Sequence, residues 1–144
     1  MTLASASRVV FVVDDEPLIS VTLELILTRA GFKTVAFTNP FEAIKAAQES
    51  APDMLISDVV MPGMTGLELG IHFRKAHPEC RVLLFSGQAS TSELLEKART
   101  EGHNFDILAK PVHPNDLLAE IHREPWFMPL VYLQEFIHSK EGKS

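Results

Sequence analysis

Short apolar runs alternate along the chain with longer segments in which apolar residues recur at helical spacing. The run at residues 8–13 is rich in valine and does not alternate with polar residues, which is typical of a strand buried on both faces. Comparable runs occupy residues 33–37, 54–57, 81–85 and 105–109. The pattern therefore predicts five strands.

Each run is followed by a segment with a helical pattern. Pro17 lies near the start of the first helix, and Gly31 ends that helix. Asn39 opens the second helix, and Asn115 or Asp116 begins the last one. We expect the stripes of the second and fourth helices to face the core. The apolar stripes along the five helices are Leu18, Val21, Leu25 and Ile26; Phe41, Ile44 and Ala47; Leu67, Leu69, Ile71 and Phe73; Leu94, Leu95 and Ala98; and Leu117, Leu118 and Ile121.

Alternation of five strands with five helices predicts an α/β fold, a doubly wound parallel sheet with helices on both faces. In such sheets, ligands bind at the carboxyl ends of the strands. Asp14 and Asp15 follow the first predicted strand, Asp58 the third, Ser86 the fourth and Lys110 the fifth. These five side chains are therefore expected to meet at one rim of the sheet.

Three carboxylates at one rim suit a hard divalent cation, because Mg2+ takes a few carboxylate or carbonyl oxygens and keeps several waters. Asp15 and Asp58 can supply direct oxygens, and Asp14 can act directly or through water. Without a cation the cluster stores electrostatic repulsion. A single aspartate of this kind is more often a helix cap or a solvated residue, but three at strand ends favour a metal site.

Lys110 provides a positive charge beside these carboxylates. Taken alone it reads as an ion pair, but next to a metal and a carboxylate nucleophile it can neutralise a phosphoryl group in transfer. Ser86 can donate its hydroxyl to the same oxygens, and Gly87 leaves room beside it. Pro111 favours a cis peptide after Lys110, which would direct the lysine into the site.

The ordered set of motifs resembles the receiver domains of two-component response regulators. It consists of Asp14-Asp15, Asp58 with residues 61–66 (MPGMTG), Ser86-Gly87 and Lys110-Pro111, in a match over roughly residues 8–123. Each piece is weak alone, but the ordered set is specific. The resemblance implies a five-stranded flavodoxin-like fold with strand order 2-1-3-4-5.

The same resemblance implies a function. Asp58 would accept a phosphoryl group from a sensor histidine kinase or phosphotransfer protein, with Mg2+ as cofactor, and would lose it by self-catalysed hydrolysis. The metal ligands would be Asp14, Asp15, Asp58 and the backbone carbonyl of Val60. A protein of this kind is a switch that signals to a downstream protein, not a conventional enzyme.

One position departs from the family pattern. Many receivers carry Tyr or Phe three residues before the lysine, as a ring that turns inward on phosphorylation, whereas this chain has Ile107 there. Phe105 projects to the same face of the sheet one step earlier. The departure puts the aromatic half of the family's coupling in doubt.

Composition limits the other classes of function. The chain has 144 residues with a net charge of -6 and no Lys/Arg cluster, which argues against direct nucleic-acid binding. No segment approaches the about 20 apolar residues of a membrane span, and no secretory signal is recognisable, so a cytoplasmic protein is expected. The single cysteine, Cys80, precedes an apolar run and is read as a buried or edge thiol.

We expect an N-terminal extension at residues 1–7, the receiver domain at 8–123 and a C-terminal tail at 124–144. No DNA-binding or catalytic module follows the receiver pattern, which predicts a stand-alone receiver that signals by protein contact, through its fourth helix, fifth strand and fifth helix. Pro125 and Pro129 interrupt the tail, and Leu130, Leu133 and Ile137 then recur at helical spacing, which predicts a short helix at 130–138. This tail either folds back on its own domain or takes part in homodimerisation or partner docking.

Two rival functions stay open. A phosphatase or phosphotransferase with an aspartyl-phosphate intermediate would use Asp14 or Asp58 as its nucleophile, but such phosphatases usually show Asp-x-Asp and a cap insert, which are not seen. A receiver scaffold that signals without phosphorylation is the other alternative. The complete set of acidic residues with Ser86 and Lys110 argues against the scaffold.

Overall fold

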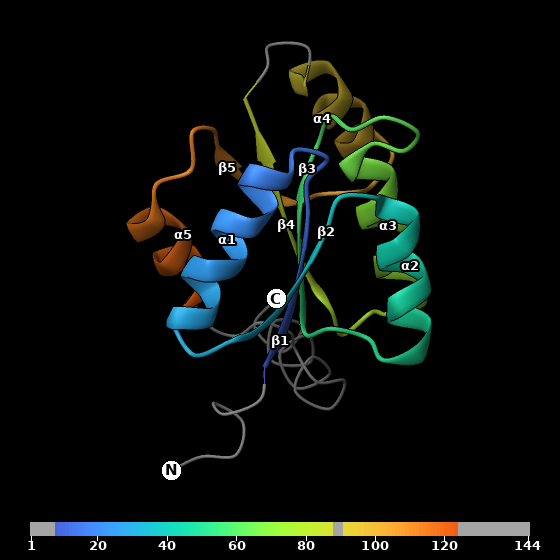
Figure 1. Cartoon of the computed structure of the whole chain (residues 1–144). Coiled ribbons are helices and arrows are strands. Elements are labelled where there is room, and N and C mark those ends of the chain that lie inside the picture. The colour runs from blue at the N-terminus through green and yellow to red at the C-terminus, as the bar shows by residue number, and fades with distance from the viewer. Residues whose placement is uncertain (1–7, 88–90, 124–144) are drawn as a thin grey trace, which may run out of the picture.

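The computed structural model describes residues 8–87 and 91–123 and forms one five-stranded sheet with five helices (Figure 1). The predicted extension at 1–7 and tail at 124–144 lie outside the described residues. The elements in chain order are β1 (Val9–Val13), α1 (Pro17–Arg29), β2 (Lys33–Phe37), α2 (Pro40–Glu49), β3 (Met54–Asp58), α3 (Gly66–Ala76), β4 (Arg81–Ser86), α4 (Thr91–Thr100), β5 (Asp106–Ala109) and α5 (Pro114–Ile121).

All strand pairs are parallel and the strand order is β2-β1-β3-β4-β5, which confirms the predicted fold. Val13 pairs with Ser57 and Asp58 with Phe85, so the ends of β1, β3 and β4 are nearly level. Ser86 pairs with Ala109, which brings the end of β5 to the same edge. The register therefore places the loops that follow these strands side by side.

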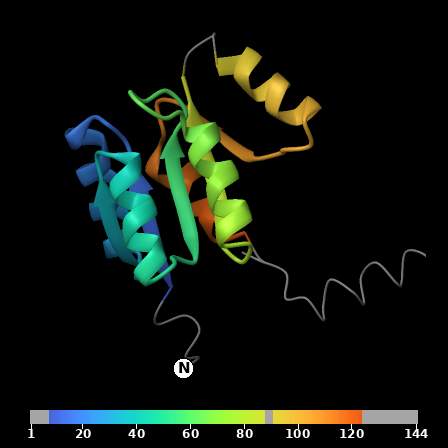
Figure 2. The same cartoon turned by 90° about the vertical axis from the view of Figure 1, so that its right-hand side faces the viewer.

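Two apolar cores lie on opposite faces of the sheet. One core joins β1, β3 and β4 to α1 and α5 and contains Leu27, Phe85 and Leu117. The other joins the sheet to α2, α3 and α4 and contains Leu55 and Phe73. Figures 1 and 2 show the resulting three layers, with α1 and α5 on one face and the other helices on the opposite face. Cys80 is buried in the second core, as the sequence indicates.

Capping side chains and a proline determine where several helices begin. The Asn39 side chain accepts a hydrogen bond from Phe41 N at 2.8 Å, and Thr65 and Glu68 form a reciprocal capping box at α3. The prediction that Asn115 or Asp116 begins the last helix is wrong, because α5 begins at Pro114. Proline suits the first helical turn, since its missing N–H would have no intrahelical partner there.

Of the apolar stripe predicted for the first helix, Ile26 packs against the core, but the other three residues do not face the sheet. Leu18, Val21 and Leu25 are 80%, 56% and 50% exposed, whereas Leu23 and Leu27 are buried. Helix α1 is apolar on both sides, so its spacing alone does not tell which side packs inward. Phe41 of α2 and Leu94 of α4 are also exposed, contrary to their predicted inward orientation. The other inward residues of these two helices, including Ala47 and Ala98, are buried or packed against the core.

An ionic cluster fastens α5 at the end of the sheet opposite the carboxyl ends of the strands. The buried Arg81 guanidinium donates to the carbonyls of Glu120 and Arg123 at 3.0 and 3.3 Å, and it also contacts the Glu120 carboxylate. Asp106 lies 3.4 Å from both Arg81 and Arg123. The His122 ring lies 5.8 Å from the Phe32 ring, just beyond the end of α1. The last described residues are therefore held beside α1 and the starts of β4 and β5.

Candidate functional site

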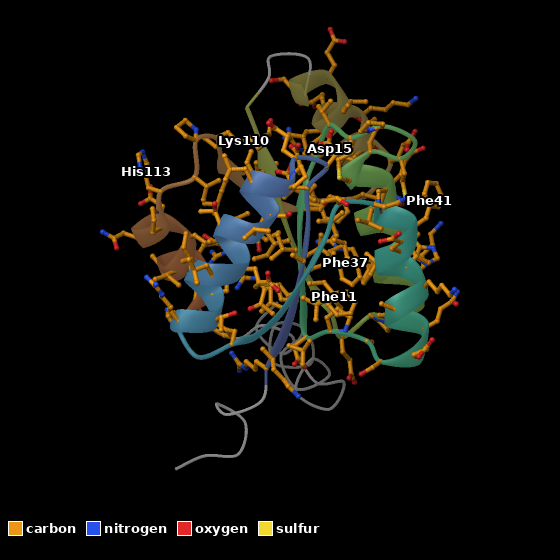
Figure 3. All side chains as sticks on the ribbon, viewed as in Figure 1. Phe11, Asp15, Phe37, Phe41, Lys110 and His113 are labelled. Carbon is orange, nitrogen blue, oxygen red and sulfur yellow. The ribbon has the colours of Figure 1, made fainter. Side chains whose placement is uncertain are left out.

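The predicted site residues gather at the carboxyl edge of the sheet. Asp14 and Asp15 follow β1, Asp58 ends β3, and Lys110 follows β5. Figure 3 labels Asp15 and Lys110, and both lie at the end of the sheet where α1 begins. The strand register, rather than proximity in sequence, brings these side chains together.

The carboxylates of Asp14, Asp15 and Asp58 form one cluster. Each offers an oxygen, and these three oxygens lie within 4.8 Å of one another. Asp14 is fully buried and Asp58 nearly so. Asp14 Oδ1 accepts a hydrogen bond from Glu16 N at 2.9 Å, which fixes the orientation of this carboxylate at the start of α1. The arrangement can bind a metal ion, as predicted from the sequence.

Lys110 lies against this cluster. Its Nζ is 3.1 Å from Asp58 Oδ2 and 3.6 Å from Asp14 Oδ2. Burial opposes the charged form of Lys110, but the hydrogen bond to Asp58 and the charges of Asp14 and Asp58 outweigh it and raise the lysine pKa. Lys110 is therefore a fixed cation at the oxygen of Asp58.

Burial raises the pKa of Asp14, and the charges of Asp58 and Asp15 act in the same direction. The hydrogen bond from Glu16 and the charge of Lys110 oppose this shift without cancelling it. The ionised cluster thus carries more negative charge than one lysine neutralises. A divalent cation would relieve this excess.

The donor atoms also fit a hard cation. Asp14 Oδ2 is buried and accepts no hydrogen bond within the described part of the chain. Lys110 Nζ, at 3.6 Å, is too far to donate a hydrogen bond to it, and a buried carboxylate oxygen without a close partner is costly. Because carboxylate oxygens are the ligands that Mg2+ prefers, the three aspartates are suited to hold this ion.

The cluster borders a hollow of about 460 Å3, open enough for a small group to enter. The lining residues are Asp15, Glu16, Asp58, Val60, Met61, Pro62, Gly87 and Lys110. Val60, the predicted carbonyl ligand, lies at this hollow. Glu16, Met61 and Pro62 were not among the predicted site residues, although each lies within three positions of a predicted one. Sequence adjacency was the signal that could have found them.

Two glycines allow the loops to close around the site. A Cβ at Gly66 would lie 2.1 Å from the carbonyl oxygen of Asp58, so only glycine lets α3 begin so close to the end of β3. Gly66 N also donates to the Val59 carbonyl at 2.8 Å. A Cβ at Gly87 would lie 2.9 Å from the Cβ of Lys110. Gly66 and Gly87 are therefore packed tightly against site residues.

Ser86 ends β4 at the same edge, and its carbonyl accepts a hydrogen bond from Lys110 N at 3.0 Å. This bond fixes the backbone of Lys110 beside β4. Ser86 is not among the residues that line the hollow, so the structure places it at the rim next to Lys110. The Lys110–Pro111 peptide is cis, as the sequence favoured.

Phe105 does not take the place of the aromatic residue that many receivers carry at the position of Ile107. Its ring packs against Gly70 and stacks under the Arg74 guanidinium, whose carbon is 4.0 Å from the ring centre. Ile107 is 40% exposed on β5. Phe105 thus belongs to the contact with α3, and Ile107 alone occupies the position near the rim.

The fold and site geometry agree with comparisons to known proteins. The family model of the response regulator receiver domain matches residues 10–122. The DNA-binding transcriptional regulator NtrC of Escherichia coli strain K12 is 34% identical over 115 residues, which are 80% of this chain and 24% of NtrC. The chain thus spans about a quarter of the length of that relative.

Two solved structures share the fold. The chemotaxis protein CheY4 of Vibrio cholerae is 29% identical with a TM-score of 0.72, over 82% of this chain and 98% of CheY4. The response regulator protein TrrA of Thermotoga maritima, in complex with Mg2+ and BeF, is 25% identical with a TM-score of 0.68, over 79% of this chain and 96% of TrrA. No helix among the described residues is long and apolar enough to cross a membrane. By its family model, its relatives and its fold, the chain belongs to the receiver domains of two-component response regulators.

Proposed function

We propose that this receiver is switched by phosphorylation of Asp58. The observation that carries the proposal is the position of Lys110 Nζ, 3.1 Å from the Asp58 carboxylate and bordering an open hollow. Phosphoryl transfer requires an aligned nucleophile and a cation where negative charge develops. Asp58 and Lys110 supply these two elements.

In the proposed reaction, the bond from phosphorus to the nitrogen of a phosphohistidine breaks as a bond to an Asp58 oxygen forms. Lys110 neutralises the oxygens of the phosphoryl group during transfer, and Ser86 donates a hydroxyl hydrogen bond to them afterwards. Hydrolysis of the acyl phosphate by water then returns Asp58 to its carboxylate. The donor is a sensor histidine kinase or a phosphotransfer protein, because receivers as a class interact with such proteins.

Mg2+ is the proposed cofactor, held by Asp14, Asp15, Asp58 and the Val60 carbonyl. The buried Asp14 oxygen without a hydrogen bond and the uncompensated charge of the cluster support this assignment. The complex of TrrA with Mg2+ and BeF supports the same ion by analogy. When bound, Mg2+ would neutralise charge on the incoming phosphoryl oxygens.

We propose residues 8–123 as the switching domain, with output through contact with a downstream protein. The rim near α4 and β5 supports this route, because Leu94 and Ile107 are exposed there. With Ile107 in place of the family's aromatic residue, movement of Ser86 alone would couple the site to that surface.

Acetyl phosphate with Mg2+ tests the assignment. Mass spectrometry of the full chain is expected to find one base-labile phosphoryl adduct, on Asp58. Asp58→Asn should abolish this adduct, whereas Asp116→Asn, at an exposed position on α5, should leave it intact. Persistence of the adduct in Asp58→Asn would refute the proposal.

The same experiment separates the rival functions. Labelling that stops at one phosphoryl group per chain supports a switch. Continuous turnover of a small phosphate ester would support a phosphatase with an aspartyl intermediate. A complete lack of labelling would support a scaffold that works without phosphorylation.

A further inference from the structure

The outer face of α1 is an apolar surface without a cover among the described residues. It consists of Leu18, Val21 and Leu25, which follow one another at spacings of three and four residues and are each at least half exposed. The opposite side of α1 is already packed, through Leu23 and Leu27, against the core. A helix that is apolar on two sides is typical of one that is buried on two sides.

The tail carries a matching pattern. Leu130, Leu133 and Ile137 have the same spacings of three and four residues. In a helix, each set spans about 10 Å, because the rise is about 1.5 Å per residue. The two stripes are therefore equal in length, and in the antiparallel direction their residues pair to within one position.

The described chain ends close to this face. His122 contacts the Phe32 ring, and Phe32 N bonds to the Leu27 carbonyl in the last turn of α1. Residues 124–129 then separate Arg123 from the predicted tail helix. Six residues can span about 20 Å when extended, which is about the length of a 13-residue helix such as α1. The linker is thus long enough to bring Leu130 to Leu25.

We propose that residues 130–138 form a helix that packs antiparallel on the outer face of α1 of the same chain. Leu130 then meets Leu25, Leu133 meets Val21, and Ile137 meets Leu18. The antiparallel direction follows from the starting point, because the tail leaves the domain at the C-terminal end of α1 and must run back along it.

Charge complementarity favours the same direction. Beyond Ile137 the tail carries Lys140 and Lys143 with Glu141 between them, and Asp15 and Glu16 directly precede α1. Antiparallel packing places these lysines beside the acidic residues, whereas parallel packing would bring them to Arg29. Because two lysines outnumber one glutamate at this end of the tail, the charges favour the antiparallel direction.

Tethering favours this domain over a second copy as the binding site. A short linker gives the tail an effective concentration in the millimolar range at its own domain, above the usual concentration of another chain. The docked helix would end beside Glu16, which lines the hollow at Asp58. The proposal does not depend on phosphorylation of Asp58.

Disulfide trapping in the full chain tests this packing. Thr22 and Gln134 lie on the same flank of their stripes and would face each other in the antiparallel pair, so Thr22→Cys with Gln134→Cys should cross-link. The control is Glu42→Cys with Gln134→Cys, since Glu42 is exposed on α2 across the sheet. The native Cys80 is buried, and burial raises its thiol pKa to about 12, so it competes little.

The expected result is a monomeric disulfide that forms at least tenfold faster in the Thr22/Gln134 pair than in the control pair. Leu133→Asp should remove that advantage, and Tyr132→Asp, on the other side of the predicted helix, should preserve it. Equal rates in the two pairs would overturn the proposal. A disulfide found mainly between two chains would also overturn it and would place the tail on a second copy.

Discussion

A Cβ atom placed on Gly87 would lie 2.9 Å from the Cβ of Lys110. This separation is shorter than carbon atoms tolerate, and Lys110 Cβ is too near the backbone to move freely. Gly87 therefore holds open the space in which the lysine side chain approaches Asp58.

Gly87→Ala should consequently displace Lys110 and slow phosphorylation. Misplacement of a catalytic group by about 1 Å can cost about 100-fold in rate, so we expect labelling of Asp58 by acetyl phosphate to slow by at least about tenfold. Single-turnover labelling followed by mass spectrometry measures this rate. A normal rate in a folded variant would show that the loop adjusts without moving the lysine.

Lys110→Met should impair the reaction more than the fold. Methionine keeps much of the lysine's length but not its charge, so the phosphoryl oxygens lose their cation. We expect labelling to slow by about 10- to 1000-fold, with a thermal midpoint in Mg2+ close to that of the parent. The matched control is Lys97→Met on the exposed side of α4, which should label normally. Equal rates for the two variants would reduce Lys110 to a structural ion pair.

Asp15→Asn should weaken binding of Mg2+ because it removes one charged ligand from an ion with few protein ligands. We expect at least a tenfold rise in the dissociation constant, measured by calorimetric titration. Without divalent ions the variant should be at least as stable as the parent, since one repulsive charge is gone. Unchanged affinity for Mg2+ would exclude Asp15 from the ligand set.

Ionisation of the Asp14 carboxyl should make the protein less stable as the pH rises, when EDTA keeps divalent ions away from the site. Its folded pKa lies above the ordinary 3.8, so between these two values the unfolded chain has released a proton that the folded chain retains. The contribution is complete below pH 3.8 and declines as the pH increases through the folded pKa.

Urea denaturation of the parent and of Asp14→Asn over this pH range isolates that contribution. The unfolding free energy of the parent minus that of the variant should fall with rising pH, and Mg2+ should recover part of the loss in the parent only. A difference that is flat or increases with pH would contradict the raised pKa.

Arg81→Ala should destabilise the domain without affecting the site. The change removes the donor to two carbonyls at the end of α5 and leaves Glu120 without its buried partner. We expect a loss of about 2–3 kcal/mol in the free energy of unfolding. Arg99→Ala, which breaks only an exposed pair with Glu96, should cost about 0.5 kcal/mol or less. Similar losses in both variants would show that the Arg81 cluster adds little.

The sequence predicted the order of elements and the meeting of Asp14, Asp58 and Lys110, because each follows a strand whose place in a parallel sheet is constrained. It did not predict which side of α1 is buried. Apolar residues surround most of that helix, and Leu18 and Leu23 are both leucines, so hydrophobicity does not tell them apart. Only the packing against β1 and β2 distinguishes them.

The sequence also could not predict the close contacts between residues of different elements. Gly66 was recognisable as part of a loop motif, but its contact with the Asp58 carbonyl depends on how α3 meets β3. The place of Phe105 depends likewise on the lack of a side chain at Gly70. Such contacts arise between elements, and spacing along one element carries no information about them.

The Arg81 cluster and the start of β1 lie at the same end of the sheet, opposite Asp58 (Figure 1). This geometry has a practical consequence for protein engineering. A reporter domain fused before Val9 and another fused after Arg123 would both emerge at one pole and leave the opposite pole open to solvent. Two fluorescent proteins attached in this way would leave the hollow at Asp58 unobstructed.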